Sequence, residues 1–437
     1  MNPPIRPIGS PNQVPELLRE RLPHCLYEQL REVGGLGEAV QVTVFAVGGL
    51  VRDLLLGVPN LDLDVVVEGD GIAFARQLAR FWGGTVTVHP PFGTAVIILP
   101  GGQHVDVATA RTEVYERPAA LPQTRPASLR EDLFRRDFTI NALAVQLNPS
   151  QFGQLVDFFG GWEDLASGTV RVLHPLSFRD DPTRILRAVR FEQRYGFHLS
   201  PDTEQRLREA LSNDWLNLLT GERLRDELSL LLQEANPLPA LRRLTEMQVW
   251  PRIHPALTGS ETALAQVERM RETVAWFREH RPDEAIVEWA GYLACLVQPK
   301  PAAGSSLSDR LRLNQKEAHI VRAVTERGAD LLAALELETR RPAEVYELLE
   351  REPIELALWL RASASAGQVR KKVERFLLHD RYLRTEISGK DLIALGYRPG
   401  PAFGEALRAA LRARLNGEAK TRAEELAVAR QVLEGGK

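Results

Sequence analysis

The sequence has few cysteines and no long apolar run. Its only cysteines, Cys25 and Cys295, lie far apart and form no CxxC pattern, which argues against a disulfide framework, a zinc site or redox chemistry. No apolar stretch approaches the roughly 18 to 20 residues that a membrane helix needs. The first residues, MNPPIRPIGSPNQ, are polar and rich in proline, unlike a signal peptide. We therefore expect a cytoplasmic protein that does not bind membranes.

The overall charge and the composition indicate no particular function. The net charge of −3 neither predicts nor excludes a nucleic-acid partner, because phosphate binding depends on clusters of Lys and Arg rather than on their total. Low-complexity tracts and short repeats are absent, and nothing indicates an oligomeric state. The 437 residues exceed what one hydrophobic core usually serves, which predicts two to four structural units.

Strand and helix signals divide the chain into two parts. Up to about residue 150, strand-like runs alternate with helical ones. The predicted strands are 42–47, 63–68, 84–88, 94–99 and 104–109, and the predicted helices are 50–56 and 72–82. From about residue 175 strand signals vanish, and helical spacing dominates. A cluster of Pro, Gly and Ser at 298–309 predicts a break between two helical units.

A glycine pair joins the first predicted strand to the first predicted helix. Gly48 and Gly49 let the backbone approach a ligand closely, and the first N–H groups of the helix would point at a phosphate placed there. Arg52 lies in the first turn, where such an anion would be within its reach. Glycines at such turns also serve packing alone, so this segment predicts either a phosphate site or a structural turn.

The next strand begins with two carboxylates, Asp62 and Asp64. Because side chains alternate along a strand, both project from one face. Two negative charges this close repel each other unless a cation lies between them, and Mg²⁺ commonly uses one or two carboxylates plus substrate phosphates. The alternative is a solvated strand edge.

Asp106 is the third candidate acid, on the strand that follows the turn at Gly101 and Gly102. If this strand neighbours the first, three carboxylates converge. Such a triad would hold two metal ions, one activating an attacking hydroxyl and one stabilising a departing pyrophosphate. The alternative is an ordinary surface aspartate.

Several ordered motifs resemble one protein family. After VFAVGGLVRDLLLG and LDLD come RRDFTINALAV (135–145), DDPTRILRAVRF (180–191), GERLRDEL (221–228) and ISGKDLIALGYRPGPAFG (387–404). In order and spacing they are similar to the class II tRNA nucleotidyltransferases and bacterial poly(A) polymerases, within the polymerase-β-like transferases. The resemblance implies an α+β fold whose mixed-sheet catalytic head, residues 1–150, is followed by a helical neck, 151–236, a helical body, 237–302, and a helical RNA-binding tail, 303–437.

The resemblance also implies an activity, namely addition of C and/or A to the tRNA 3′ end from CTP and/or ATP with Mg²⁺. The alternatives are a poly(A) polymerase and a catalytically silent RNA-binding protein on the same scaffold. The implied metal ligands are Asp62 and Asp64. The implied nucleotide-binding residues are Gly49, Arg52, Arg136, Asp137, Asn141, Asp181, Arg184, Arg187 and Arg190, with Asp137 and Asn141 at the ribose.

Asp181 and Arg184 would select the base. Cytosine and adenine each present an amine donor beside a ring-nitrogen acceptor, so a carboxylate accepts from the first and a guanidinium donates to the second. Uracil and guanine reverse both partners. Two alternatives stay open: Asp181 precedes Pro182 and would cap its own helix, and Arg190 would form a surface salt bridge. Asp180 stands where many relatives carry Glu, which leaves a supporting role for it in doubt.

Two further stretches bear on the substrate. Residues 110–134 are rich in proline and arginine and predict an irregular loop, which resembles the family's flexible loop that helps the pocket accept A. The basic run 361–384 predicts RNA contacts by Arg370, Lys371, Lys372 and Arg375. The alternatives are a surface loop without a switching role and a solvated helix face. By resemblance, the turn 396–401 would present backbone N–H groups to RNA.

Overall fold

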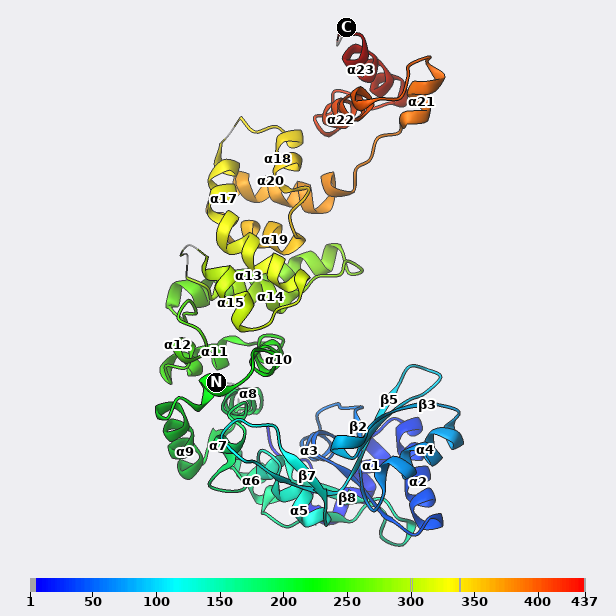
Figure 1. The fold of residues 1–437 in the computed structure, drawn as a ribbon, viewed down its shortest axis with the longest axis vertical. Helices are drawn as coiled ribbons and strands as arrows, with labels where there is room; N and C mark the ends of the chain where they lie inside the picture. The colour runs from blue at the N-terminus through cyan, green and yellow to red at the C-terminus, as the bar shows by residue number, and fades with distance from the viewer. Residues whose placement is uncertain (1–4, 299, 301, 338, 436–437) are drawn as a thin grey trace. The chain divides into compact units, whose positions relative to one another are not determined.

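The computed structural model describes residues 5–298, 300, 302–337 and 339–435. The chain forms two compact units, Met1–Glu227 and Leu228–Lys437 (Figure 1). The predicted boundary between head and neck at residue 150 falls inside the first unit. The finer division into four domains stays a prediction.

A mixed sheet forms the centre of the first unit. In the described residues it has seven strands in the order β3-β4-β5-β2-β1-β8-β9. The strands of this sheet are β1 (Thr43–Val47), β2 (Leu63–Glu68), β3 (Thr85–His89), β4 (Thr94–Ile98), β5 (His104–Thr109), β8 (Leu143–Gln146) and β9 (Leu155–Asp157). All five predicted strands are therefore confirmed, two of them with the bounds expected from the sequence.

The register of the sheet places the acidic residues. Strand β2 pairs with β1 antiparallel and with β5 parallel, and in the second pair Asp64 lies opposite Asp106. The expectation that these two strands are neighbours is therefore confirmed. Four short strands stand outside the sheet: β6 (Arg111–Val114) with β7 (Gln123–Pro126), and β10 (Thr169–Val170) with β11 (His198–Leu199). The last is the one exception, in the described chain, to the expected loss of strands after residue 175.

Helices pack around this sheet (Figure 1). The helices of the first unit are α1 (Val14–Arg21), α2 (His24–Ala39), α3 (Gly49–Leu56), α4 (Gly71–Trp82), α5 (Leu129–Phe134), α6 (Gly161–Ser167), α7 (Ser177–Asp180), α8 (Arg184–Tyr195) and α9 (Pro201–Ser212), with a 3₁₀ turn η3 (Thr139–Asn141). Asp70 caps α4 by accepting the Ala73 N–H at 2.9 Å, and Gly57 ends α3 in the left-handed conformation. Ile185 and Val189 on α8 are fully buried, as expected for core positions.

Helix α10 (Gly221–Leu232) crosses the boundary between the units, and the described part of the second unit is helical. Its helices are α11 (Leu238–Glu246), α12 (Trp250–Ile253), α13 (Glu261–His280), α14 (Glu288–Cys295), α15 (Ala303–Arg310), α16 (Gln315–Arg322), α17 (Gly328–Glu336), α18 (Pro342–Leu349), α19 (Ile354–Ser363), α20 (Gly367–Leu378), α21 (Gly389–Ala394), α22 (Pro401–Leu415) and α23 (Arg422–Gly435). The predicted break at 298–309 is helical from Ala303 onward, and residues 299 and 301 lie outside the described residues.

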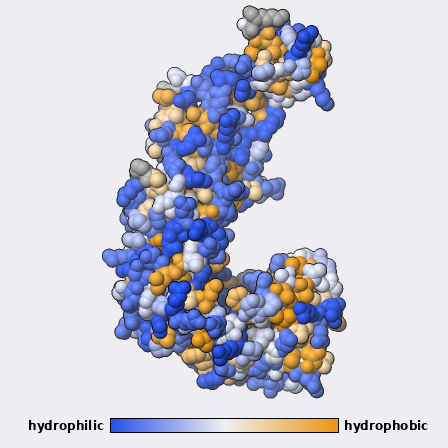
Figure 2. All heavy atoms as spheres, in the orientation of Figure 1, coloured by the Kyte–Doolittle hydropathy of each residue, from blue (hydrophilic) through white to orange (hydrophobic). Residues whose placement is uncertain are grey.

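Hydrophilic residues cover most of the second unit on the face drawn in Figure 2, with apolar residues in smaller groups. At its C-terminal end, Leu392, Ala406 and Ala429 join α21, α22 and α23 in a small core of their own. None of the helices in the described chain combines the length and the hydropathy that crossing a membrane requires.

Candidate functional site

One cleft of the first unit gathers most of the predicted site residues. Its volume is about 470 Å³. The lining residues are Gly48, Gly49, Arg52, Asp64, Glu113, Tyr115, Arg135, Arg136, Asp137, Asn141, Asp181, Thr183, Arg184, Arg187 and Glu227. Five arginines and five acidic residues therefore face one space. Such a lining suits a polyanionic ligand that also carries hydrogen-bonding groups.

The glycine turn between β1 and α3 lies at the wall of this cleft. Gly48 has φ 68° and ψ −125°, a conformation that residues with a Cβ rarely adopt. A Cβ at Gly48 would also lie only 2.9 Å from Nη1 of Arg136. Glycine at this position therefore permits both the turn and the close approach of the guanidinium.

The three candidate carboxylates occupy neighbouring strands. Asp64 lines the cleft, Asp106 lies opposite it on β5, and the exposed Asp62 directly precedes β2. The Asp62 N–H donates to Oδ1 of Asn60 at 2.9 Å, which fixes the backbone there. Burial raises the pKa of Asp64 to about 6, the Asp106 and Asp62 charges add to this rise, and Arg136 opposes it.

The expected three-carboxylate metal site stays a prediction. Among the described residues, no group of three or more His, Cys, Asp or Glu side chains is close enough to hold a metal ion. Asp62 stands outside the paired part of β2, and Asp106 is exposed. Carboxylate oxygens held near one another, with a raised pKa at Asp64, still fit a hard divalent cation that takes its remaining ligands from water and phosphate.

Arg52 is buried at the base of the cleft and is already engaged. Its Nε and Nη2 donate to the Asp53 carboxylate, both at 2.8 Å, and its Nη1 donates to Oδ1 of Asn141 at 2.5 Å. Asp53 also accepts from the Tyr195 hydroxyl at 2.9 Å. Asp53 was not singled out from the sequence. Its position directly after Arg52 in an otherwise apolar helix could have indicated a buried ion pair.

The same network continues into α8. Asn141 donates to Oδ1 of Asp137 at 2.9 Å, and Arg187 donates to Oδ2 of Asp137 from Nε at 2.9 Å and from Nη2 at 2.6 Å. Burial alone would raise the pKa of Asp137, but Arg187 and Asn141 outweigh it and hold the pKa at about 2. Arg187 also donates to Glu227 of α10 at 3.1 Å. Asp137 and Asn141 therefore hold the arginines of the cleft in place.

Asp181 is fixed through one of its carboxylate oxygens. Its Oδ1 accepts from the Thr183 N–H at 3.0 Å, from the Thr183 hydroxyl at 2.5 Å and from Nη2 of Arg223 at 2.7 Å. Within the described residues, Oδ2 has no donor. Helix α8 begins at Arg184 with Thr183 at its N-cap, so Asp181 is not the N-cap of this helix, although it accepts the Thr183 N–H just before it. The Asp181 side chain also lines the cleft.

Arg184 is buried beside Asp181. Its Nη1 donates to Oγ of Ser177 at 2.6 Å and its Nη2 to the main-chain oxygen of Arg135 at 2.7 Å. Arg190, by contrast, does not line the cleft. Its side chain is 8 % exposed and its Nη2 lies 3.7 Å from the Glu227 carboxylate, so Arg190 forms the salt bridge of the alternative, but buried rather than at the surface.

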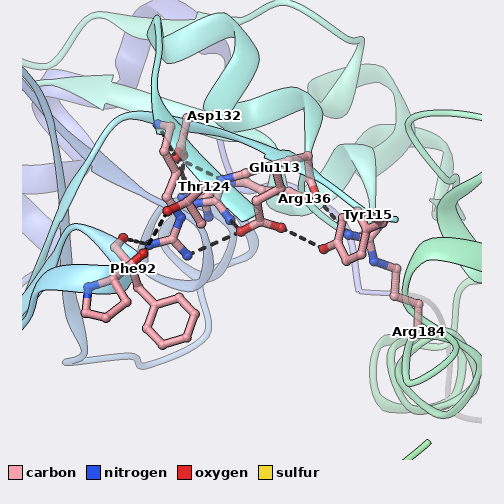
Figure 3. Close-up of polar contacts among 10 residues, drawn as sticks. Phe92, Glu113, Tyr115, Thr124, Asp132, Arg136 and Arg184 are labelled. Carbon is pink, nitrogen blue, oxygen red and sulfur yellow. Dashed lines mark hydrogen bonds and ion pairs between the residues drawn. The ribbon is translucent and has the colours of Figure 1, made fainter. Parts of the chain in front are cut away.

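The stretch 110–134 is ordered, contrary to the expected irregular loop. Strands β6 and β7 pair as a hairpin from Arg111 opposite Pro126 to Val114 opposite Gln123. Glu113 of this hairpin accepts from Arg135 at 2.9 Å and from the Tyr115 hydroxyl at 2.7 Å. Figure 3 shows the Tyr115 ring between Glu113 and Arg184.

Further contacts anchor the hairpin. The Thr124 hydroxyl donates to the main-chain oxygen of Pro91 at 2.9 Å, and Arg111 donates to that of Phe92 (Figure 3). The sequence did not single out Glu113, Tyr115, Arg135, Thr183 and Glu227, which line the cleft, or Arg223, which donates to Asp181. Glu113 and Tyr115 come from the hairpin stretch and the others from separate motifs, and no spacing rule links these groups.

The predicted RNA-binding residues of α20 divide into two pairs. Lys372 donates to the main-chain oxygens of Leu335 and Leu337 at 3.1 and 2.6 Å, which satisfies the C-terminal end of α17. Arg375 pairs with Asp380 at 3.1 Å and donates to the Leu415 oxygen at 2.7 Å. Arg370 and Lys371 are exposed. Arg375 is exposed too, but it and Lys372 are engaged in these bonds, so RNA contact by Arg370 and Lys371 would break no described bond.

Comparison with family models matches two parts of the chain. Residues 44–171 match the "Poly A polymerase head domain", which spans the glycine turn, the carboxylates and the RRDFTINA motif. Residues 196–260 match the "Probable RNA and SrmB- binding site of polymerase A".

Similar proteins agree with these matches. The A-adding tRNA nucleotidyltransferase of Geobacter sulfurreducens is 40% identical over 98% of this chain, which spans 50% of that relative's length. The A-adding tRNA nucleotidyltransferase of Halalkalibacterium halodurans is 33% identical, over 95% of both chains. Among solved structures, the Thermotoga maritima CCA-adding enzyme complexed with tRNA has a TM-score of 0.74 and 34% identity, covering 97% of this chain and 98% of that one.

The resemblance drawn from the motifs is thus confirmed over nearly the whole chain. The mixed-sheet head, the helical remainder and the ordered motifs agree with the relatives. This chain belongs to the tRNA nucleotidyltransferase family, whose head domain is shared with poly(A) polymerases.

Proposed function

We propose that this protein adds A to the 3′ end of a tRNA that already ends in CC. The 3′-hydroxyl oxygen attacks the α-phosphorus of ATP, the bond from that phosphorus to the pyrophosphate breaks, and the hydroxyl proton is released. The observation that carries the proposal is the cleft itself, which joins Asp64 to the Asp181–Arg184 pair. Two relatives named as A-adding enzymes favour A over C as the added nucleotide.

The acidic and glycine-rich side of the cleft would receive the triphosphate. Asp62 and Asp64 would hold Mg²⁺, with Asp106 nearby, and bound Mg²⁺ activates the hydroxyl and neutralises charge on the phosphates in such transfers. A pair of metal ions in this role is part of the proposal. The open backbone at Gly48 and Gly49 and the Arg136 guanidinium would contact the phosphate oxygens.

Base selection would rest on Asp181 and Arg184. Oδ2 of Asp181 is the carboxylate oxygen with no described donor, so it would accept the exocyclic amine of adenine. Arg184 uses two of its five N–H groups on Ser177 and Arg135, which leaves donors for the ring nitrogen. Guanine would place a carbonyl against a carboxylate and a ring N–H against a guanidinium, and a mispaired buried polar group costs large factors in rate.

A second candidate is addition of the complete CCA end. It is favoured by the Thermotoga structure, which belongs to a CCA-adding enzyme. Cytosine presents the same donor and acceptor order as adenine, so the Asp181–Arg184 pair by itself does not exclude it. The cytoplasmic location and tRNA as the RNA substrate remain predictions for this chain.

The deciding experiment supplies three tRNAs, ending before CCA, after C and after CC, each with CTP alone or ATP alone, and measures product length. We expect one A on the CC-ended tRNA with ATP and no extension of the other two with CTP. Extension of the shorter tRNAs by C would establish CCA addition instead. Long A tails on any RNA would indicate a poly(A) polymerase, and no extension at all would leave only the silent RNA-binding alternative.

A further inference from the structure

Arg223 connects the Asp181 carboxylate to the hairpin whose residues Glu113 and Tyr115 line the cleft. It lies on α10, one turn before Glu227. Its Nη2 donates to Oδ1 of Asp181 at 2.7 Å, while its Nη1 donates to the main-chain oxygen of Ala119 at 2.9 Å. The side chains of Arg223 and Asp181 are each 23 % exposed, so this ion pair is largely shielded from solvent.

Ala119 belongs to the connection between β6 and β7, and its own backbone is held in an uncommon conformation. Its φ is 60°, in the left-handed region that residues with a Cβ seldom adopt. Its N–H donates to the main-chain oxygen of Arg179, two residues before Asp181, at 3.1 Å. Both backbone polar groups of Ala119 are therefore engaged. Its N–H bonds to α7, and its main-chain oxygen accepts from Arg223.

Both nitrogen ends of the guanidinium are needed for this arrangement. Nη1 and Nη2 point to different acceptors, one a main-chain oxygen of the hairpin and one a carboxylate of the base-selecting pair. A lysine ammonium is a single point charge that keeps the ion pair but does not span two acceptors in a fixed fork. Arginine at this position therefore suits a bridge between the hairpin and Asp181.

We propose that Arg223 is a positioning residue for base selection, which couples the conformation of the hairpin connection to the orientation of the Asp181 carboxylate. With Oδ1 occupied by Thr183 and Arg223, Oδ2 is left as the acceptor for the base. A movement of the hairpin connection would pull on the same guanidinium that holds this carboxylate. The inference rests on the proposed function, because it concerns the base that the cleft selects.

The first test compares Arg223→Met, Arg223→Lys and Arg225→Met. Arg225 is a matched control on the same helix, since it pairs with the neighbouring Asp226 instead. Affinities for ATP and GTP are measured by titration calorimetry, and kcat and KM for both nucleotides are measured on CC-ended tRNA. Arg223→Met loses one charge-assisted hydrogen bond to Asp181. We therefore expect its preference for ATP over GTP to fall by about 10- to 100-fold.

Arg223→Lys should recover part of that preference, because it restores the charge beside Asp181, and Arg225→Met should behave as the wild type. Unfolding temperatures measured in parallel show whether a variant has lost its fold. A folded Arg223→Met variant with an unchanged ATP-to-GTP preference would overturn the inference. Because nucleotide affinity is measured without RNA, this result is distinct from a wild-type protein that fails to extend tRNA, which would overturn the proposed function.

The second test asks whether the hairpin acts through Arg223. Ala119→Pro forces φ to about −65° and removes the N–H that Arg179 accepts, whereas Ala119→Gly adopts φ 60° without strain. We expect Ala119→Pro, and not Ala119→Gly, to lower the ATP preference. In the Arg223→Met background, Ala119→Pro should have little further effect, because the coupling is already lost. Additive losses in the double variant would contradict the coupling.

Discussion

Nη2 of Arg187 lies 2.6 Å from Oδ2 of Asp137, and this bond joins the head motif RRDFTINA to helix α8. The Asp137 side chain is 9 % exposed, and its other oxygen accepts from Asn141. Through Asn141 the same network reaches Arg52 and Asp53. The two motifs that the resemblance assigned to nucleotide binding are thus physically one assembly.

Asp137→Asn should therefore be strongly destabilising. Removing one partner of a buried ion pair leaves the other charge uncompensated, which costs about 3–5 kcal/mol. Urea denaturation of the variant measures this loss. Asp202→Asn is the matched control, because Asp202 pairs with Arg206 on the surface with 58 % exposure and should cost below about 1 kcal/mol. Equal losses in the two variants would refute the structural role of Asp137.

Because of His174, we expect the free energy of unfolding to fall in mild acid. Burial and the nearby Arg184 lower its pKa to about 4, so the folded protein keeps this imidazole neutral. The unfolded chain, with a pKa near 6.5, takes up a proton first, and stability should fall as the pH drops from about 6.5 to about 4, by roughly 1–2 kcal/mol after solvent screening. Unfolding temperatures across this range should fall less steeply for His174→Gln. Identical slopes would show that His174 does not contribute.

Gly48→Ala should slow transfer while leaving the chain folded. The added Cβ would meet the Arg136 guanidinium at 2.9 Å and would have to adopt φ 68°. Strain of about 1–3 kcal/mol at the turn, with displacement of Arg136, predicts a fall in kcat/KM of at least about 10-fold. Gly101→Ala is the control, because a Cβ there meets no atom within 4 Å. Full activity of Gly48→Ala would show that the cleft does not need this close approach.

The two pairs of basic residues on α20 should behave differently. Arg370→Met and Lys371→Met should each weaken tRNA binding and flatten its dependence on salt, with the slope of log K against log salt falling by about 0.7–0.9. Lys372→Met should instead lower the unfolding temperature, because its ammonium satisfies two carbonyls at the end of α17. Binding measured at several salt concentrations separates the two effects. A normal salt slope in Arg370→Met would remove that residue from the proposed RNA surface.

The strands and the acidic residues could be predicted because their signals are local. Alternation along the strand predicted Asp62 and Asp64 on one face, whereas the pairing that sets Asp106 opposite Asp64 was only a condition until the structure showed it. The glycine pair at the start of α3 could be recognised from the sequence in the same way. These features depend on neighbours in the sequence, so a single chain contains the information.

The contacts that close the cleft could not be predicted in the same way. Arg223 reaches Asp181 from 42 positions away and Ala119 from 104, and no periodicity connects them. Lys372 was predicted to bind RNA but instead donates to main-chain oxygens at the end of α17. A lysine in a basic run looks the same in the sequence whether it contacts phosphate or a helix end. Tertiary packing decides which partner a side chain has, and the local sequence pattern does not contain that information.

Asp64 is proposed to belong to the transfer site, and the rate of A addition by an Asp64 variant tests this role directly. Single-turnover addition of A to CC-ended tRNA is followed with Mg²⁺ and ATP for the wild type and Asp64→Asn, with Asp202→Asn as a charge-matched control. Wild type and Asp202→Asn should add one A at the same rate. Asp64→Asn should be folded and at least about 100-fold slower, since it removes a negative ligand from the proposed metal site. An Asp64→Asn variant that adds A at the wild-type rate would show that Asp64 has no part in the transfer.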